Sequence, residues 1–180
     1  GIQKYFPGVH ALDIALLENG DNMDRVAGGE AAGVSAYIWT TDKLGYFCMS
    51  TTIDDTTFKD ENARLAVAYA LDIPAIVDAV MGSGAISATS ILPVGNWAYE
   101  DTPFEYNTDK SKAALKALGK PDGFSFRILV ASDQNVDVKL AEAMQAYLSQ
   151  VGIDMQIDTA DQFSVMGEQM GGTQLAGILT

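Results

Sequence analysis

FKDENARLAVAYALD, residues 58–72, decides the predicted fold, because its apolar residues recur at the period of an α-helix. Five of them form one apolar stripe: Ala63, Ala66, Val67, Ala70 and Leu71. Asp72 and Pro74 interrupt this stripe, and both residue types are favourable at the start of a helix. The sequence therefore predicts a second helix from Ile73 to Met81, which the Gly82-Ser83-Gly84 run ends.

The residues that follow predict an α/β fold. Asn107 is expected to cap a helix that runs to Leu118 and ends at Gly119. Beyond it, runs of β-branched and aromatic residues alternate with helical stripes. The expected strand, helix, strand, helix and strand cover Phe124–Ala131, Asn135–Val151, Ile153–Ile157, Gln162–Met170 and Thr173–Leu179. The first three of these form a βαβ unit, which is expected to be parallel and right-handed.

The helix over Asn135–Val151 is expected to bury one side against the sheet. The residues expected on that side are Val138, Ala141, Met144, Ala146 and Leu148. Four methionines stand within helical or strand patterns and are expected to fill the core instead of forming an adaptable binding surface: Met144, Met155, Met166 and Met170.

Residues before the helical pair predict a smaller β/α segment. Strands are expected over Leu12–Leu17, Val34–Trp39 and Tyr46–Ser50. Asp21 or Asn22 is expected to cap a short helix that reaches about Ala32. We place the boundary near Gly45, so residues 1–45 form one segment and residues 46–180 form the main unit.

A long loop is predicted over Gly84–Glu105, which has no period and contains Pro93, Gly95 and Pro103. Its apolar side chains argue against disorder, because such side chains seek a packed surface. They are Ile91, Leu92, Trp97, Tyr99 and Phe104. Trp97 fits two roles equally well, since its ring suits either the lining of a cleft or the anchoring of the loop.

Composition and charge exclude several classes of protein. The 180 residues are 48% hydrophobic and 19% charged, which is typical of a globular chain. The net charge of −13 and the lack of a lysine and arginine cluster disfavour binding to nucleic acids and to anionic lipids. No apolar run is long enough to predict a transmembrane helix.

The chain offers few residues for catalysis or metal binding. His10 is the only histidine and Cys48 the only cysteine, whereas a zinc site takes three or four ligands. No nucleophile elbow, Walker loop or dinucleotide-binding fingerprint occurs. The acidic pairs Asp54-Asp55 and Asp60-Glu61 suit a cation site or an acid/base pair, but their place before a helix favours stabilisation of its N terminus. We therefore predict no cofactor, no metal ion and no catalytic residue.

Three blocks of the chain carry, in order, the pattern of one known family. The first consists of Phe58, Asp60, Arg64, Ala66, Val67, Tyr69, Ala70, Leu71, Asp72, Ala75, Ile76, Val77, Val80 and Gly82, with Leu92-Pro93 after them. The second consists of Asn107, Ala113, Leu115, Leu118, Gly119, Asp122, Gly123 and Phe124, and the third of Ala141, Met144, Gln145, Leu148, Gly152, Ile153 and Ile157. Together they resemble the extracytoplasmic solute-binding proteins of peptide and nickel ABC importers, family 5. Thr56-Thr57 and Ile73-Pro74 depart from the family pattern, which has Pro-Pro and a basic-acidic pair there.

The resemblance implies part of a two-lobed, type II periplasmic-binding-protein-like fold with a mixed sheet. Residues 1–45 then lead from the first lobe, and residues 46–180 form part of the second ligand-binding lobe. The implied function is capture of an oligopeptide or dipeptide between closing lobes and its delivery to ABC permease subunits. The candidate ligand-binding residues are Phe47, Met49, Thr51, Trp97 and Tyr99. Arg64 suits a ligand carboxylate, but its place near Asp60 favours a structural ion pair.

Such a protein is expected outside the cytoplasmic membrane, in the periplasm or as a cell-surface lipoprotein, with any signal outside this sequence. The incomplete lobe is expected to favour a homodimer that covers its exposed apolar surface. Three alternatives stay open: a nickel- or haem-binding member of the same family, an α/β small-molecule enzyme that uses the carboxyl end of its sheet, and a partner-binding module.

Overall fold

The computed structural model describes residues 44–52, 56–171 and 177–179. The strands predicted over Leu12–Leu17 and Val34–Trp39, and the helix predicted from Asp21, lie outside these residues. The described elements are β1 (Phe47–Met49), η2 (Thr57–Lys59), α2 (Glu61–Ala70), α3 (Ile73–Met81), η3 (Gly82–Gly84), α4 (Thr108–Ala117), β2 (Ser125–Ala131), α5 (Asn135–Ser149), β3 (Asp154–Ala160), α6 (Gln162–Gly171) and β4 (Gly177–Leu179). The predicted α/β class is confirmed.

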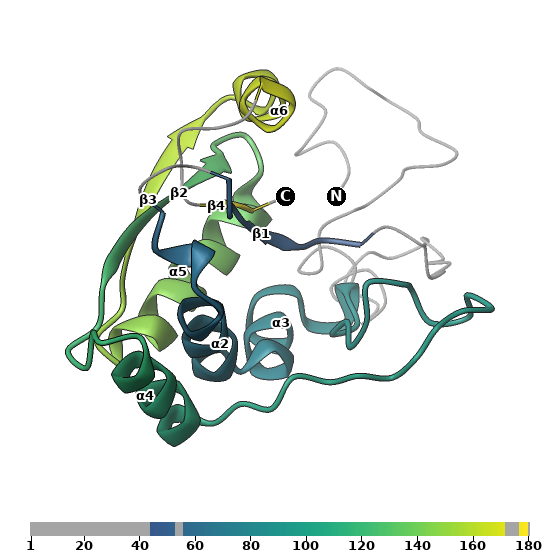
Figure 1. Ribbon diagram of the computed structural model, residues 1–180. Helices are drawn as coiled ribbons and strands as arrows, with labels where there is room; N and C mark the ends of the chain where they lie inside the picture. Colours follow the sequence, from purple (N-terminus) through teal and green to yellow (C-terminus); the bar gives the residue numbers. More distant parts are fainter. Residues whose placement is uncertain (1–43, 53–55, 172–176, 180) are drawn as a thin grey trace, which may run out of the picture.

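A mixed sheet of order β1-β4-β2-β3 forms the centre of the domain (Figure 1). β2 is parallel to β3, as the βαβ pattern predicts, and it is also parallel to β4, whereas β1 is antiparallel to β4 at the edge. The register aligns Phe47 with Leu179, Val130 and Thr159 across the four strands. Phe47 therefore lies toward the carboxyl ends of the parallel strands.

The helical pair has the boundaries that its sequence signals predict. Asp60 caps α2 by accepting a hydrogen bond from the backbone N–H of Asn62, at 2.8 Å. Asp72 caps α3 through the N–H of Ala75, at 3.2 Å, and proline stands in the first turn. At its other end α3 stops at Gly82, whose φ of 51° is a conformation that glycine adopts without strain. Both predicted ends of α3, Ile73 and Met81, are confirmed.

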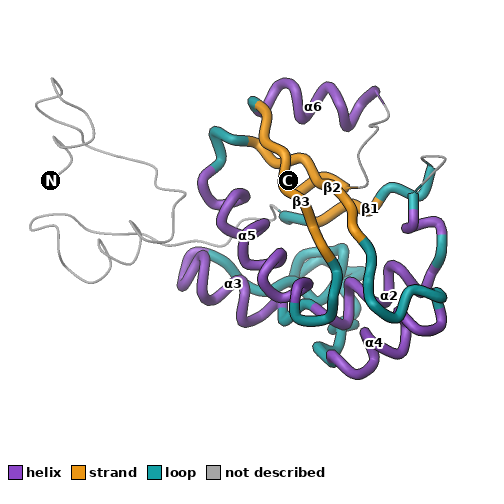
Figure 2. The backbone as a smooth tube through the Cα atoms, turned by 90° about the vertical axis from the view of Figure 1, so that its left-hand side faces the viewer, coloured by secondary structure: helices purple, strands orange, loops and turns teal. Residues whose placement is uncertain are grey.

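Helices cover both faces of the sheet unequally. Figures 1 and 2 show α2, α4 and α5 on one side of the strands and α6 on the other. The main core lies on the α5 side, where Phe58 meets Phe126 and Phe124 with ring centroids 4.9 and 5.8 Å apart. On the α6 side, a small cluster unites Leu129, Ala131 and Val165. The sheet is therefore anchored by the large core and only lightly covered on its other face.

Two glycines join the turns at the amino ends of β2 and β3. Gly123 and Gly152 have φ values of 97° and 87°, and their backbones nearly touch. A Cβ added to Gly123 would lie 1.8 Å from the carbonyl oxygen of Gly152. The N–H of Asp154 donates to the carbonyl of Phe124, at 2.9 Å, and starts the β2–β3 pairing. Only glycine permits this approach of the two chains.

Some predicted core residues are exposed. Ala146 faces solvent because it is five residues beyond Ala141 and two before Leu148, which places it on the opposite side of α5. Met144 and Met155 are buried as predicted, whereas Met166 of α6 is 41% exposed, and Val165 of the same helix packs in the small cluster on the sheet. Among the helices that the structure describes, none combines the length and apolar character that a membrane crossing requires.

Candidate functional site

The carboxyl ends of the parallel strands form one edge of the sheet, where open α/β sheets bind their ligands. β2 ends at Ala131 and β3 at Ala160, and the two are paired in register. Because β1 is antiparallel, its first residue Phe47 lies toward this edge and Met49 lies away from it. We name this side, with its β2–α5 and β3–α6 turns, the carboxyl edge.

The two turns at the carboxyl edge are joined by hydrogen bonds. The N–H of Ser132 donates to the carbonyl of Ala160 at 2.7 Å, and Gln134 Nε2 donates to Gln162 Oε1 at 3.3 Å. Ser132, Asp133 and Gln134 are exposed, and no side chain caps the N terminus of α5 there. These residues are not among the ligand-binding candidates predicted from the sequence, although the βαβ pattern places them after the carboxyl end of β2.

Asp161 at the start of α6 serves mainly to hold that helix. Its carboxylate accepts from Ser164 Oγ at 2.5 Å and from the Ser164 N–H at 3.1 Å. These hydrogen bonds lower the pKa of Asp161 below its usual value, and the bond from the Ser164 hydroxyl has a larger effect than the bond from its backbone N–H. The carboxylate is therefore ionised at neutral pH and already engaged within α6.

The predicted strand residues lie at different positions along β1. Phe47 is half-buried and its ring contacts Phe126, with centroids 6.3 Å apart. Met49 is also half-buried and packs against the main core. Thr51 is exposed and follows the end of β1 that points away from the carboxyl edge. Of the three, Phe47 has the position that best suits contact with a ligand at that edge.

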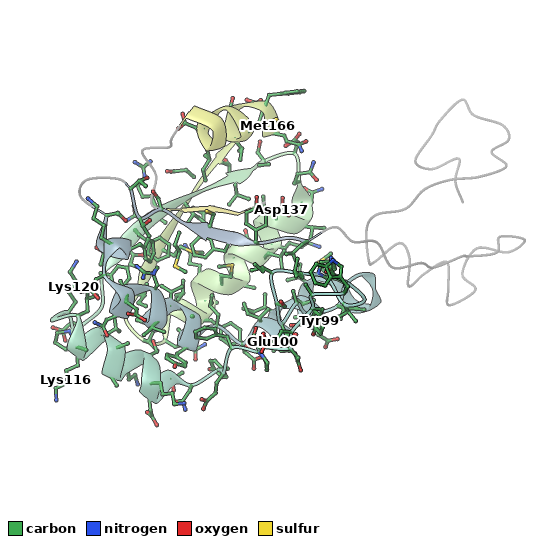
Figure 3. All side chains as sticks on the ribbon, turned by 45° about the vertical axis from the view of Figure 1, so that its right-hand side comes forward. Tyr99, Glu100, Lys116, Lys120, Asp137 and Met166 are labelled. Atoms are coloured by element: carbon green, nitrogen blue, oxygen red, sulfur yellow. The ribbon has the colours of Figure 1, made fainter. Side chains whose placement is uncertain are left out.

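The predicted loop residues differ in exposure. Tyr99 is half-buried, and its hydroxyl lies 2.7 Å from Thr89 Oγ1 and donates to Asp101 Oδ1 at 3.3 Å. Trp97 is 96% exposed and Ile91 is 87% exposed, so the expectation that these side chains pack against the domain is wrong. Figure 3 shows Tyr99 on the same side of the domain as Asp137, which stands in the first turn of α5. The loop thus presents Trp97 to solvent instead of being anchored by it.

Arg64 has a structural role. Its Nη1 donates to the carbonyl oxygens of Phe58 at 2.6 Å and Lys59 at 3.1 Å. The guanidinium therefore holds the η2 turn against α2 through backbone carbonyls. The sequence had favoured an ion pair between Arg64 and Asp60 instead. That carboxylate instead accepts from Asn62.

Metal ligands do not gather in the part of the chain that the structure describes, where no three histidine, cysteine, aspartate or glutamate side chains are placed to hold an ion. Cys48 is exposed on β1. His10 and the Asp54-Asp55 pair lie outside the described residues. The geometry of the described residues therefore offers hydrogen-bonding and apolar groups for binding.

An α/β domain with polar turns at the carboxyl edge of its sheet has the arrangement in which open α/β sheets bind ligands. The chain belongs to the bacterial extracellular solute-binding proteins, family 5, whose middle-region model matches residues 4–176. The resemblance seen in the sequence is thereby confirmed. Among its relatives, the glutathione-binding protein GsiB of Escherichia coli O157:H7 is 28% identical over 148 residues, which cover 82% of this chain and 26% of that protein. The dipeptide-binding protein of E. coli K12 is 31% identical over 122 residues, 64% of this chain and 22% of that protein.

Solved structures of binding proteins share the fold. The periplasmic binding protein DppA from Helicobacter pylori, in complex with peptide STSA, matches 76% of this chain and 26% of its own, with a TM-score of 0.66 and 26% identity. The substrate-binding protein CtaP from Listeria monocytogenes matches 87% of this chain and 33% of its own, with a TM-score of 0.76 and 20% identity, which shows the fold alone. The domain is thus part of a type II periplasmic-binding-protein fold, and the chain spans about a quarter of the length of the curated relatives it matches.

Proposed function

We propose that this chain belongs to the substrate-binding component of an ABC importer, which captures peptides outside the cytoplasmic membrane and delivers them to a permease. The observation that carries the proposal is the family match over residues 4–176, which includes β1, β2, β3 and both turns of the carboxyl edge. Relatives that match this region bind glutathione, the peptide STSA and the dipeptide Met-Leu. All three of these solutes are short peptides.

The chain contributes the second of two lobes in this proposal. Residues 1–45 lead from the first lobe, and residues 46–180 form part of the second, whose sheet begins with β1 at Phe47. The ligand lies between the lobes, which close around it by a hinge motion, and the permease recognises the closed form.

Recognition of the peptide combines polar and apolar groups. The polar side chains of Ser132 and Gln134 suit the backbone amides of an extended peptide, because both are exposed at the carboxyl edge. The aromatic residues proposed to contact the peptide are Phe47, Trp97 and Tyr99. The two remaining proposed ligand-binding residues lie further from the carboxyl edge, since Met49 ends β1 and Thr51 follows it.

The remaining parts of the proposal concern partners and location. The relatives are transport proteins and not enzymes, and we propose binding without catalysis for this chain as well. The expected partners are a peptide ligand and ABC permease subunits, in the periplasm or at the surface of the cell as a lipoprotein. A homodimer is proposed through apolar surface such as Phe163 and Met166 of α6, which are 85% and 41% exposed.

Calorimetric titration with defined dipeptides and tripeptides tests this function. The purified chain is expected to bind at least one of them saturably with unit stoichiometry, and chromatography of the mixture is expected to recover the peptide unchanged. Size-exclusion chromatography with light scattering measures the dimer in parallel. Hydrolysis of the peptides, or no binding at all across a mixed library, would contradict the proposal.

A further inference from the structure

The loop between η3 and α4 is held in one shape by its own hydrogen bonds. Thr102 donates from its backbone N–H and from its hydroxyl to the carbonyl of Thr89, at 3.2 and 3.1 Å, and closes the loop at its base. Inside it, the N–H of Asn96 donates to Pro93 at 3.1 Å, and the N–H of Tyr99 donates to Asn96 at 3.0 Å. We name residues 89–102 the closed loop. These hydrogen bonds define its shape.

The closed loop turns its apolar side chains away from the domain. Ile91 is 87% exposed, Val94 is 74% exposed and Trp97 is 96% exposed. A loop that holds such side chains in water offers apolar surface that a partner can cover. Trp is also the side chain that most often dominates a binding interface.

The charges beside these apolar side chains all have one sign. Glu100 and Asp101 stand three and four residues after Trp97, and the segment 84–107 contains no lysine, arginine or histidine. Glu105, its third acidic residue, is paired with Lys110 of α4. Within the described ranges, no cation pairs with Glu100 or with Asp101, which accepts only the Tyr99 hydroxyl. Lys116 and Lys120 lie at the opposite end of the domain in Figure 3.

From this arrangement we infer that the closed loop binds a cationic, apolar peptide: a segment in which a bulky apolar side chain packs on Trp97 while a neighbouring lysine or arginine meets Glu100 and Asp101. This inference rests on the proposed peptide-binding function and names its substrate class. Complementary charge selects the occupant, because an acidic peptide is repelled by both carboxylates and gains nothing that compensates. The Tyr99 hydroxyl fixes the Asp101 carboxylate in place for this contact.

Calorimetry with three tripeptides tests the inference: Lys-Leu-Lys, Ser-Leu-Ser and Glu-Leu-Glu. Wild type is expected to bind Lys-Leu-Lys about tenfold more tightly than Ser-Leu-Ser, since each exposed ion pair changes affinity by roughly threefold. The double variant Glu100→Gln/Asp101→Asn keeps the hydrogen-bond acceptors and removes both charges. It is expected to bind Lys-Leu-Lys and Ser-Leu-Ser equally, with the affinity for Ser-Leu-Ser unchanged.

A matched control separates the local effect from the net charge of −13. Asp122→Asn/Glu142→Gln removes two exposed carboxylates elsewhere on the domain and is expected to keep the preference for Lys-Leu-Lys. If the loop variant also keeps the preference, or if wild type binds Glu-Leu-Glu equally well, the charge selection is wrong while the peptide-binding function stands. If wild type binds none of the three and no member of the mixed library, the proposed function itself fails.

Discussion

Replacement of Gly123 by alanine tests the close contact that joins β2 and β3. The new Cβ would lie 1.8 Å from the carbonyl oxygen of Gly152, so the two turns must separate by more than 1 Å to restore van der Waals distance. Alanine at a φ of 97° costs about 1–2 kcal/mol, and overpacking adds roughly 1–3 kcal/mol. We expect Gly123→Ala to lower the free energy of unfolding by about 3 kcal/mol in total.

Gly119→Ala is the matched control, because Gly119 has a φ of 79° and no heavy atom within 4 Å of an added Cβ. It carries the conformational cost without the steric one and is expected to lose only about 1–2 kcal/mol. In Gly152→Ala the new Cβ would lie 2.6 Å from the Asp122 carbonyl oxygen. Its loss in free energy of unfolding is expected to lie between those of the other two variants or to equal that of Gly123→Ala. Urea unfolding followed by circular dichroism measures all three. Equal losses for Gly119→Ala and Gly123→Ala would refute the close contact.

Three further predictions concern single side chains. Ser111→Ala removes the buried hydrogen bond to the carbonyl of Ala66, at 2.7 Å, and is expected to lower the free energy of unfolding in urea by about 1–3 kcal/mol. Its control is Ser149→Ala at an exposed site, which is expected to lower the free energy of unfolding by less than about 1 kcal/mol. Because the folded pKa of Asp161 lies below its unfolded value, its contribution to α6 is present above the unfolded pKa and lost as pH falls through the folded pKa. The protection factors of the α6 amides, which correct for the intrinsic pH dependence of exchange, are therefore expected to fall under acid in wild type and to lose this pH dependence in Asp161→Asn. Trp97→Ala is expected to change stability by no more than about 0.5 kcal/mol, since the side chain is 96% exposed, while it weakens peptide binding measured by calorimetry.

Elements with signals at both ends were predictable from the sequence. α3 has a capping aspartate and a proline at its start and a glycine at its stop, and its predicted bounds agree with the structure. Asn107 likewise caps α4, and its side chain accepts from the N–H groups of Asp109 and Lys110. Such signals act within a few residues, so the sequence contains all the information that they need.

Features that depend on distant residues were not predictable in this way. The antiparallel pairing of Phe47 with Leu179 joins residues more than a hundred positions apart, and it decides which end of β1 lies toward the carboxyl edge. The hydrogen bonds from Thr102 to Thr89 close the loop across thirteen positions. The apolar composition of the loop does not reveal this closure, and it therefore suggested that Trp97 packs against the domain, whereas its side chain is exposed. Ser132 was missed because its bond to Ala160 exists only once β2 and β3 are paired.

Residues at the amino ends of the strands stabilise the domain, whereas the exposed Trp97 is proposed to bind. The contact between Gly123 and Gly152 and the ring cluster of Phe58 and Phe124 lie at the amino ends of the strands. Trp97, in contrast, is almost wholly in water and supports nothing in the domain. This separation suits the proposed hinged lobe, because a binding surface that opens and closes must do so without loss of the core. We therefore expect closed-loop variants to change which peptide is bound while the free energy of unfolding stays the same. Variants at the amino ends of the strands are expected to lower the free energy of unfolding while the peptide preference stays the same.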